Sequence, residues 1–393
     1  MERNIKIAYV VGSLRNSWFW LGVWILVYLS ITDYAGLGLV EAALFVTTIL
    51  LEVPTGAFAD LVGKRITLVL AFMFSAICNI SIAFSQNLQQ LILSVIIGGV
   101  GMSLYSGAFE AMVYDSLLEI KKEAKYIQVI SRVNALQLLT MAFCSIVGGF
   151  LYNVDHKLPF LLNGIMVGIA SGLALGLVEP KKDTQKVSWG CYWQQNAEGF
   201  GHLFNKGLAW SVPFLLVVGS FYALSEEMLD SVLGVEFGLR PELLGILFST
   251  ISIIGAGFSY LSSKFVVGNI FWGILFISTI SGISYVLSPM AGVVVGSVLL
   301  IVRNSMMAVH QNYLSTFINQ HISSKYRATT LSSFSLLKML PYAISAPFLG
   351  MMMQQVTAKR FTLVMGVTML VITMWQGVVY FYQKGGRAYR VNY

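Results

Sequence analysis

The chain has 393 residues, of which 56% are hydrophobic and only 11% are charged. A soluble domain carries about 25% charged residues, so this composition excludes an ordinary water-soluble protein. The net charge of +7 does not indicate nucleic-acid binding, because the basic residues are spread over short segments and form no stripe with stacking aromatic residues. The three cysteines follow no disulfide or metal-ligand spacing.

Long apolar segments recur from one end of the chain to the other. A helix needs about 20 apolar residues to span a membrane, and only helices or closed barrels can satisfy their backbone groups there. The segments show no period-2 alternation, which favours helices. In chain order, the predicted spans are 5–31, 38–59, 66–85, 88–118, 126–152, 159–179, 207–233, 241–263, 268–288, 290–318, 327–353 and 360–382.

The predicted fold class is therefore an all-α membrane protein with twelve transmembrane helices. One substantial polar break, at 180–206, separates six spans from six. Lys125-Tyr126 and Lys325-Tyr326 open the fifth and eleventh spans, a faint repeat of the kind found in transporters with two parallel halves. The expected parts are an N-terminal six-helix bundle at 1–180, a cytoplasmic linker at 181–206, a C-terminal six-helix bundle at 207–383 and a cytoplasmic tail at 384–393.

Lysine and arginine residues at the ends of the spans and between them are unevenly distributed. Seventeen would lie on one side of the membrane and four on the other, the four being Lys157, Arg240, Lys359 and Arg360. The positive-inside rule then predicts that both termini lie in the cytoplasm of a multi-pass protein of the cell (inner) membrane. Lys359 and Arg360 run against the bias, and the sequence offers no physical reason for them.

The connection between the second and third spans carries a recognisable motif. Residues 56–65 read Gly-Ala-Phe-Ala-Asp-Leu-Val-Gly-Lys-Arg. This resembles the loop motif of the major facilitator superfamily, Gly-x-x-x-Asp-x-x-Gly-Arg/Lys-Arg/Lys. Further similarity lies in 107–116, at the end of the fourth span, and in Arg327-Ala328-Thr329, at the start of the eleventh. The resemblance covers nearly the whole chain and implies the major facilitator fold, two six-helix bundles that alternate access to a central cavity.

The motif describes a tight turn and a gate. Gly56 is small enough to let a neighbouring helix approach closely, and Gly63 permits a sharp turn. Asp60 stands at a helix end, where a carboxylate can cap the N-terminus of another helix. The resemblance implies that this second helix is the eleventh, near Arg327.

Four further residues belong to the same predicted gate. Lys64 or Arg65 would reach Asp115 and hold the two halves together when the cavity faces outward. The alternative is that Lys64 and Arg65 only anchor the topology. Glu52 is assigned to the bend at Pro54 rather than to ligand contact.

Ionisable side chains inside the spans are the candidates for function. Each costs at least ~2.5–3.5 kcal/mol at mid-membrane, so it normally has a partner or a role. In the family that the chain resembles, helices 1, 4, 7 and 10 line the cavity. The predicted substrate or proton-coupling residues are Arg15, Trp18, Glu110, Glu226, Asp230, Arg303 and Lys338.

Spacing supports part of this set. Arg15 and Glu110 fall at similar depth in the first and fourth spans, and Glu226 and Asp230 are four residues apart, on one face of the seventh. The alternative is that these charges form static ion pairs between helices. His310 is interpreted as a hydrogen-bonded structural residue.

Other functional classes find no support. Gly63-Lys64 is not a phosphate-binding loop, because Phe58 and Arg65 stand where that loop needs Gly and Ser or Thr. The sequence contains no His-Glu-x-x-His or Gly-x-Ser-x-Gly motif. We therefore expect neither an ATP-driven pump nor an enzyme, and no cofactor or metal.

The expected function is secondary transport of a small molecule, with proton-coupled efflux as the first interpretation. Many antiporters carry an Arg in helix 4 where this chain has Ser94, and this difference speaks against proton antiport. Uptake of an anionic metabolite is the alternative, with Arg15, Arg303 and Lys338 holding its carboxylate or phosphate. A receptor or scaffold that has lost transport is the alternative from another class. The expected partners are the lipid bilayer, the solute and protons, for a chain that acts as a monomer.

Overall fold

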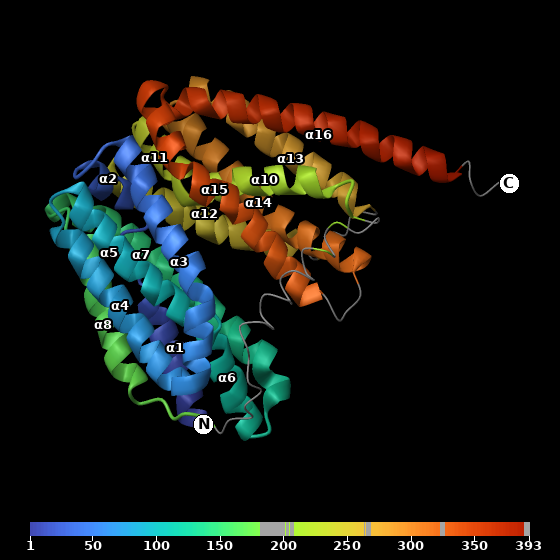
Figure 1. Cartoon of the computed structure of the whole chain (residues 1–393). Coiled ribbons are helices and arrows are strands. Elements are labelled where there is room, and N and C mark those ends of the chain that lie inside the picture. Colours follow the sequence, from blue (N-terminus) through green and yellow to red (C-terminus); the bar gives the residue numbers. More distant parts are fainter. Residues whose placement is uncertain are drawn as a thin grey trace. The chain divides into compact units, whose positions relative to one another are not determined.

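A computed structural model describes residues 1–180, 201, 204, 208–262, 264, 269–322 and 327–388, and its regular elements there are all helical (Figure 1). Ten helical segments in these ranges are long and apolar enough to cross a membrane. The first predicted span coincides with the interrupted pair α1 and α2. The sixth coincides with α8, which has only 17 residues. The count of twelve spans therefore stays a prediction. Most of the predicted linker, 181–206, lies outside the described residues.

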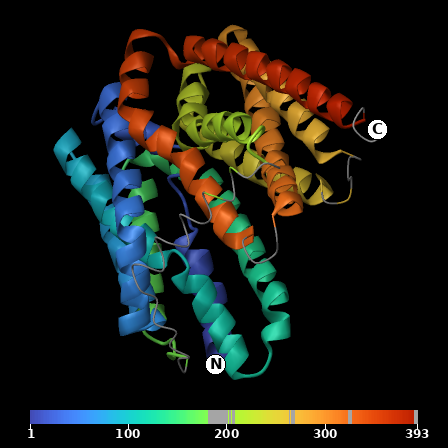
Figure 2. The same ribbon diagram turned by 45° about the vertical axis from the view of Figure 1, so that its right-hand side comes forward.

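One compact unit combines Met1–Tyr192 with Arg240–Thr250 and Ser345–Gln354. Its α4 packs against α5 and α8 (Figures 1 and 2). In chain order, the N-terminal part of this unit holds α1 (Glu2–Arg15), α2 (Trp24–Leu29), α3 (Tyr34–Val62), α4 (Lys64–Phe84), α5 (Leu88–Tyr105), α6 (Ala108–Glu119), the single turn η1 (Glu123–Lys125), α7 (Tyr126–Val154) and α8 (Leu158–Ala174).

The other unit combines Trp193–Leu239 with Ile251–Ile344 and Gln355–Tyr393. The first part of α12 and the end of α15 belong to the first unit. The remaining elements, in chain order, are α10 (Val212–Leu224), the π-helical turn η2 (Ser225–Leu229), α11 (Asp230–Glu236), α12 (Pro241–Ser262), α13 (Ile270–Leu287), the turn η3 (Ser288–Met290), α14 (Val293–His321), α15 (Arg327–Gln355) and α16 (Ala358–Ala388).

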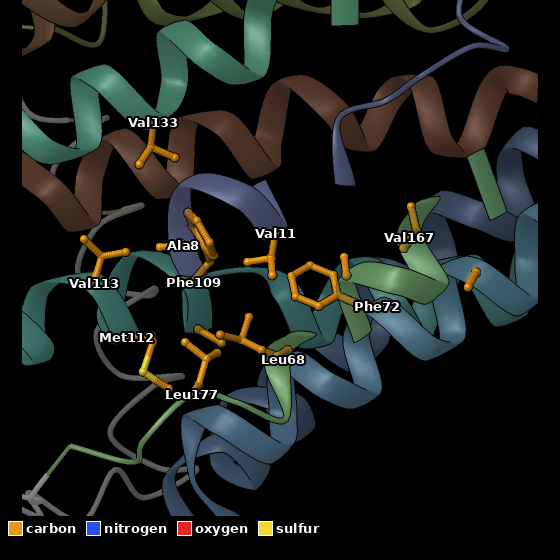
Figure 3. Packing of buried hydrophobic residues seen from close by; sticks show 14 of the residues in the cluster. Ala8, Val11, Leu68, Phe72, Phe109, Met112, Val113, Val133, Val167 and Leu177 are labelled. Atoms are coloured by element: carbon orange, nitrogen blue, oxygen red, sulfur yellow. The ribbon is translucent and has the colours of Figure 1, made fainter. Parts of the chain in front are cut away.

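An apolar core holds the first unit together. α1, α4, α6, α7 and α8 meet around Val11, Phe72, Phe109 and Val167, none of them more than 1% exposed (Figure 3). Hydrophobic burial drives helices together less in lipid than in water, so close van der Waals contact matters more. This core fixes α1 and α6, which carry candidate site residues at their ends.

Three of the predicted spans contain a break or an irregular turn. The first breaks at 16–23, between α1 and α2. The fourth breaks after Tyr105, where Gly107 has φ +72°, a left-handed conformation that glycine adopts without strain. The seventh contains the π-helical turn η2, and such turns are frequent at functional sites. These irregularities lie inside the predicted spans 5–31, 88–118 and 207–233, and the segments Leu88–Glu119 and Val212–Glu236 are each still long and apolar enough to cross a membrane.

Candidate transport site

A buried ion pair lies in the second unit. Asp230 and Arg303 are each 1% exposed, and Arg303 Nη2 donates a hydrogen bond to Asp230 Oδ1. Asn304 Nδ2 donates to the other carboxylate oxygen over 2.6 Å, and the Arg303 guanidinium lies 4.4 Å from the centre of the Tyr285 ring. Both carboxylate oxygens are therefore satisfied. A buried charge is tolerable only with such partners, so neither residue can lose the other cheaply.

Polar side chains continue from this pair along α10, α13 and α14. The Tyr285 hydroxyl shares a short hydrogen bond with Ser225 in η2. One turn earlier on α13, Ser281 shares a 2.8 Å hydrogen bond with Tyr222, whose ring centre lies 4.9 Å from that of His310. The sequence pattern did not point to Tyr285 or Asn304, although Asn304 directly follows Arg303 in the chain.

Glu226 and Lys338 lie in the same unit. Glu226 is exposed, whereas Asp230, four residues later, is buried. The positive charge of Lys338 acts on Glu226, and Glu226 also experiences the charge of Asp230. The stem of Lys338 packs over Gly219, whose added Cβ would lie 3.3 Å from the Lys338 Cβ. Two acidic and two basic groups of the predicted set therefore lie close together.

In the first unit, Arg15 ends α1 and lies against aromatic rings. Its guanidinium is 3.8 Å from the centre of the Tyr105 ring, which stacks on Phe109 at 5.3 Å. Glu110, in the first turn of α6, is exposed, and among the described residues it forms no ion pair with Arg15. The described residues therefore give no support to the alternative of a static ion pair between Arg15 and Glu110, and the coupling role of both residues stays a prediction.

The interruption between α1 and α2 is held by one buried amide. Asn163, on α8, donates to the Ser17 carbonyl oxygen over 2.7 Å and accepts from Trp20 Nε1 over 3.0 Å. Trp20 in turn stacks on the half-buried Trp18, with ring centres 5.1 Å apart. Trp18 was predicted as a site residue, whereas Asn163 was missed because nothing in its sequence neighbourhood points to helix 1.

The predicted gate residues give mixed results. Lys64 forms an ion pair with Asp115, as the motif suggested, and Gly63 has φ +106°, which fits the predicted sharp turn. Arg65 Nη2 instead donates to the Leu175 carbonyl oxygen over 2.6 Å. The gating role of these contacts stays a prediction.

The rest of the predicted gate concerns Gly56, Arg327 with Asp60, and Glu52. Gly56 is exposed, and an added Cβ would have no described atom within 4 Å. The close approach of a neighbouring helix at Gly56 stays a prediction. The side chain of Arg327 lies outside the described residues, so its relation to Asp60 stays a prediction. Glu52 is half-buried and lies two residues before Pro54 within α3. In the described part of the chain, no group of three or more His, Cys, Asp or Glu residues could hold a metal ion.

Comparison with known proteins identifies relatives over part of the chain. It is 29% identical over 161 residues to the uncharacterized MFS-type transporter YxaM of Bacillus subtilis (strain 168), which covers 40% of this chain and 39% of that protein. It is 24% identical over 149 residues to the quinolone resistance protein NorA of Staphylococcus aureus, and this alignment covers 38% of this chain and 37% of NorA. The alignments thus span about two fifths of the curated relatives.

Solved structures share the fold over nearly the whole length. The nucleoside transporter NupG superposes with a TM-score of 0.78 at 14% identity, covering 96% of this chain and 98% of that one. A POT family transporter in complex with 5-aminolevulinic acid superposes with a TM-score of 0.70 at 13% identity, covering 97% of this chain and 96% of that one. The family model described as Major Facilitator Superfamily matches residues 7–340. The chain therefore belongs to the Major Facilitator Superfamily, as an all-α membrane protein with that fold.

Proposed function

We propose that this secondary transporter exports small organic molecules in exchange for protons. The buried pair of Asp230 and Arg303 carries the proposal. Because the pair is shielded from water, a proton that binds Asp230 changes the net charge of the pair from zero to +1. The similarity to NorA, named for quinolone resistance, supports the direction of transport. We place the chain in the bacterial inner membrane as a monomer, with both termini in the cytoplasm.

Protonation of Asp230 is the proposed coupling step. A proton that binds a carboxylate oxygen of Asp230 forms one O–H bond, makes the side chain neutral and leaves Arg303 as an uncompensated buried charge. Such a charge is strongly unfavourable, so it favours a rearrangement that hydrates or re-pairs the guanidinium. Exposed Glu226, which is electrostatically coupled to Asp230, supplies an entry point for the proton. Many antiporters carry an Arg in helix 4, where this chain has Ser94. In this proposal the Asp230–Arg303 pair has the coupling role instead.

Anion uptake fits the geometry less well. Arg303 is engaged by Asp230, and Arg15 is stacked on Tyr105. Lys338 remains as a cation for a substrate carboxylate, but the carboxylate of Glu226 is near enough to interact with it electrostatically and would compete with that substrate. Glu110 is exposed and makes no ion pair among the described residues, so it ranks behind Asp230 as the coupling group.

Gradient-driven transport by the wild-type chain tests the proposal. The purified protein would be reconstituted in proteoliposomes. The probes would be a quinolone and those solutes that raise the melting temperature of the protein, since a ligand stabilises the state it binds. An acidic lumen should drive accumulation of at least one probe, and nigericin, which collapses the pH gradient, should abolish it. Accumulation that ignores the imposed gradient would contradict proton coupling, and empty liposomes are the control.

A further inference from the structure

Several polar atoms buried in the second unit have no hydrogen-bond partner among the described residues. They are Arg303 Nε and Nη1, His310 Nε2, Ser278 Oγ and Asn319 Oδ1, of which the first four concern the polar groups described above. Arg303 and His310 are each 1% exposed, and Ser278 is fully buried. An unsatisfied buried polar group costs about 1–3 kcal/mol, so native proteins normally satisfy it with protein or with bound water.

The first four atoms lie along one continuous polar stripe. Arg303 stacks over Tyr285, which lies one turn from Ser281 on α13. Ser281 hydrogen-bonds Tyr222, and Tyr222 lies against His310. Arg303 and His310 are seven residues apart on α14, which places them about 10 Å apart along the helix axis at 1.5 Å per residue. The stripe thus joins the ion pair to a buried histidine through hydroxyl groups from two other helices.

We propose that water molecules bind along this stripe and form a proton path between His310 and the Asp230–Arg303 pair. Buried waters typically make about three hydrogen bonds to groups that would otherwise be unsatisfied, and the stripe offers such groups at its two ends, on Arg303 and His310, and on Ser278, three residues before Ser281 on α13. The proposal rests on the proposed function in one respect: the path matters for transport only if Asp230 takes up a proton.

Each step along the path conserves atoms and charge. The proton that Asp230 has taken up leaves its carboxyl oxygen and passes from one water or hydroxyl oxygen to the next, so one O–H bond forms as another breaks, and the last transfer forms an N–H bond on His310. The charged and titratable groups that face the path are Glu226, Lys338, Tyr222, Tyr285 and Arg303. In the predicted topology, His310 lies on the cytoplasmic side of Arg303, because α14 would run from the outer surface inward. His310 is therefore more than the structural residue that the sequence suggested.

Hydroxyl-radical footprinting with X-ray pulses tests whether the stripe is hydrated, independently of any transport. Radicals formed from bound water modify adjacent side chains even when these are buried, and mass spectrometry locates the products. After correction for intrinsic reactivity, Tyr222, Tyr285 and His310 should react several-fold faster than Phe214, a 3%-exposed residue on the same α10 as Tyr222. Reaction of all three at the rate of Phe214 would overturn the proposal.

Two variants then test the proton path. His310→Phe should lower the footprinting rate of Tyr222 and slow pH-driven accumulation several-fold, while exchange of solute between compartments of equal pH stays unchanged. His310→Gln, which keeps a polar group in place, should recover much of both losses. Unchanged pH-driven accumulation in a correctly folded His310→Phe protein would overturn the path. If Asp230→Asn also left proton coupling intact, the proposed function would fall, whereas the hydration result would stand.

Discussion

Two carboxylates each cap the start of a helix with both oxygens. Glu179 accepts from the backbone N–H groups of Lys64 and Arg65, each over 2.8 Å, at the N-terminus of α4. Glu236 does the same for Ala358 and Lys359 at the N-terminus of α16, over 2.7 and 2.9 Å. The first N–H groups of a helix have no partner within the helix, and the helix dipole favours an anion there.

The second cap explains a residue that the charge bias left unexplained. Lys359 Nζ donates to the Ala291 carbonyl oxygen over 2.9 Å and lies 5.0 Å from the centre of the Phe237 ring. The positive charge of Lys359 therefore has fixed partners near the ends of neighbouring helices. A basic residue with fixed partners of this kind can lie on the side that the positive-inside rule disfavours.

Replacing Glu179 with Gln should destabilise the protein. The amide loses the charge and one of the two acceptor oxygens, so the free energy of unfolding should fall by about 1 kcal/mol, the size of a typical lost helix cap. Thermal unfolding in detergent measures the change, with Glu123→Gln in the exposed turn η1 as the control. Equal melting temperatures for the two variants would mean that the cap contributes nothing.

At the scale of elements, α7 and α12 cross within the first unit at a contact between backbones. A Cβ added to Gly149 would lie 2.6 Å from the Pro241 carbonyl oxygen, and one added to Gly245 would lie 3.2 Å from the Gly149 nitrogen. Ser145 Oγ also donates to the Gly245 carbonyl oxygen over 3.0 Å. Small residues let membrane helices approach this closely, and side chains would hold them apart.

Gly245→Ala and Gly255→Ala should have opposite effects, although both lie on α12. At Gly245 the new methyl group would meet the backbone of α7, so the unfolding free energy should fall by about 1–3 kcal/mol, as overpacking usually costs. At Gly255 nothing described lies within 4 Å, so alanine should be neutral or stabilise the helix by up to about 1 kcal/mol. Melting temperatures that fall equally would contradict the close crossing.

The sequence predicted where helices lie better than where they break. Apolar length is a local property, so the spans follow from it. Gly107 alone could have indicated the break in the fourth span, because a glycine between Tyr105 and Phe109 permits a left-handed turn. The break in the first span depends on Asn163, which is 146 residues from Ser17 in the chain. Tertiary contacts of this kind cannot be predicted from one sequence.

For the whole molecule, the loop motif predicted the family and the general activity. The motif was informative because Gly63 and Lys64 serve a turn and an ion pair that both appear in the structure. The site was only partly predictable. Asp230 and Arg303 were identified as costly charges, but their pairing joins residues 73 apart in the chain. The amide and hydroxyl groups that complete the site carry no charge and give no signal in an apolar span.

The membrane topology follows from charge bias and is open to direct test. In a protein whose native cysteines are replaced by serine, a Cys placed at Asp155 should react with an impermeant maleimide added to intact cells. A Cys placed at Lys122 should react only after the membrane is made permeable, because the positive-inside rule places this residue in the cytoplasm. The opposite pattern of reactivity would overturn the predicted orientation.

The central claim is that Asp230 couples protons to the solute. Its most direct test is the pH change that solute addition evokes inside proteoliposomes, recorded with an entrapped fluorescent pH indicator. Asp230→Asn should abolish this pH change while exchange of solute at equal pH persists, because the amide cannot take up the proton yet keeps the size of the side chain. Asp155→Asn, an exposed residue far along the chain from the site, should behave as wild type. A solute-evoked pH change of wild-type size in the Asp230→Asn protein would contradict the account.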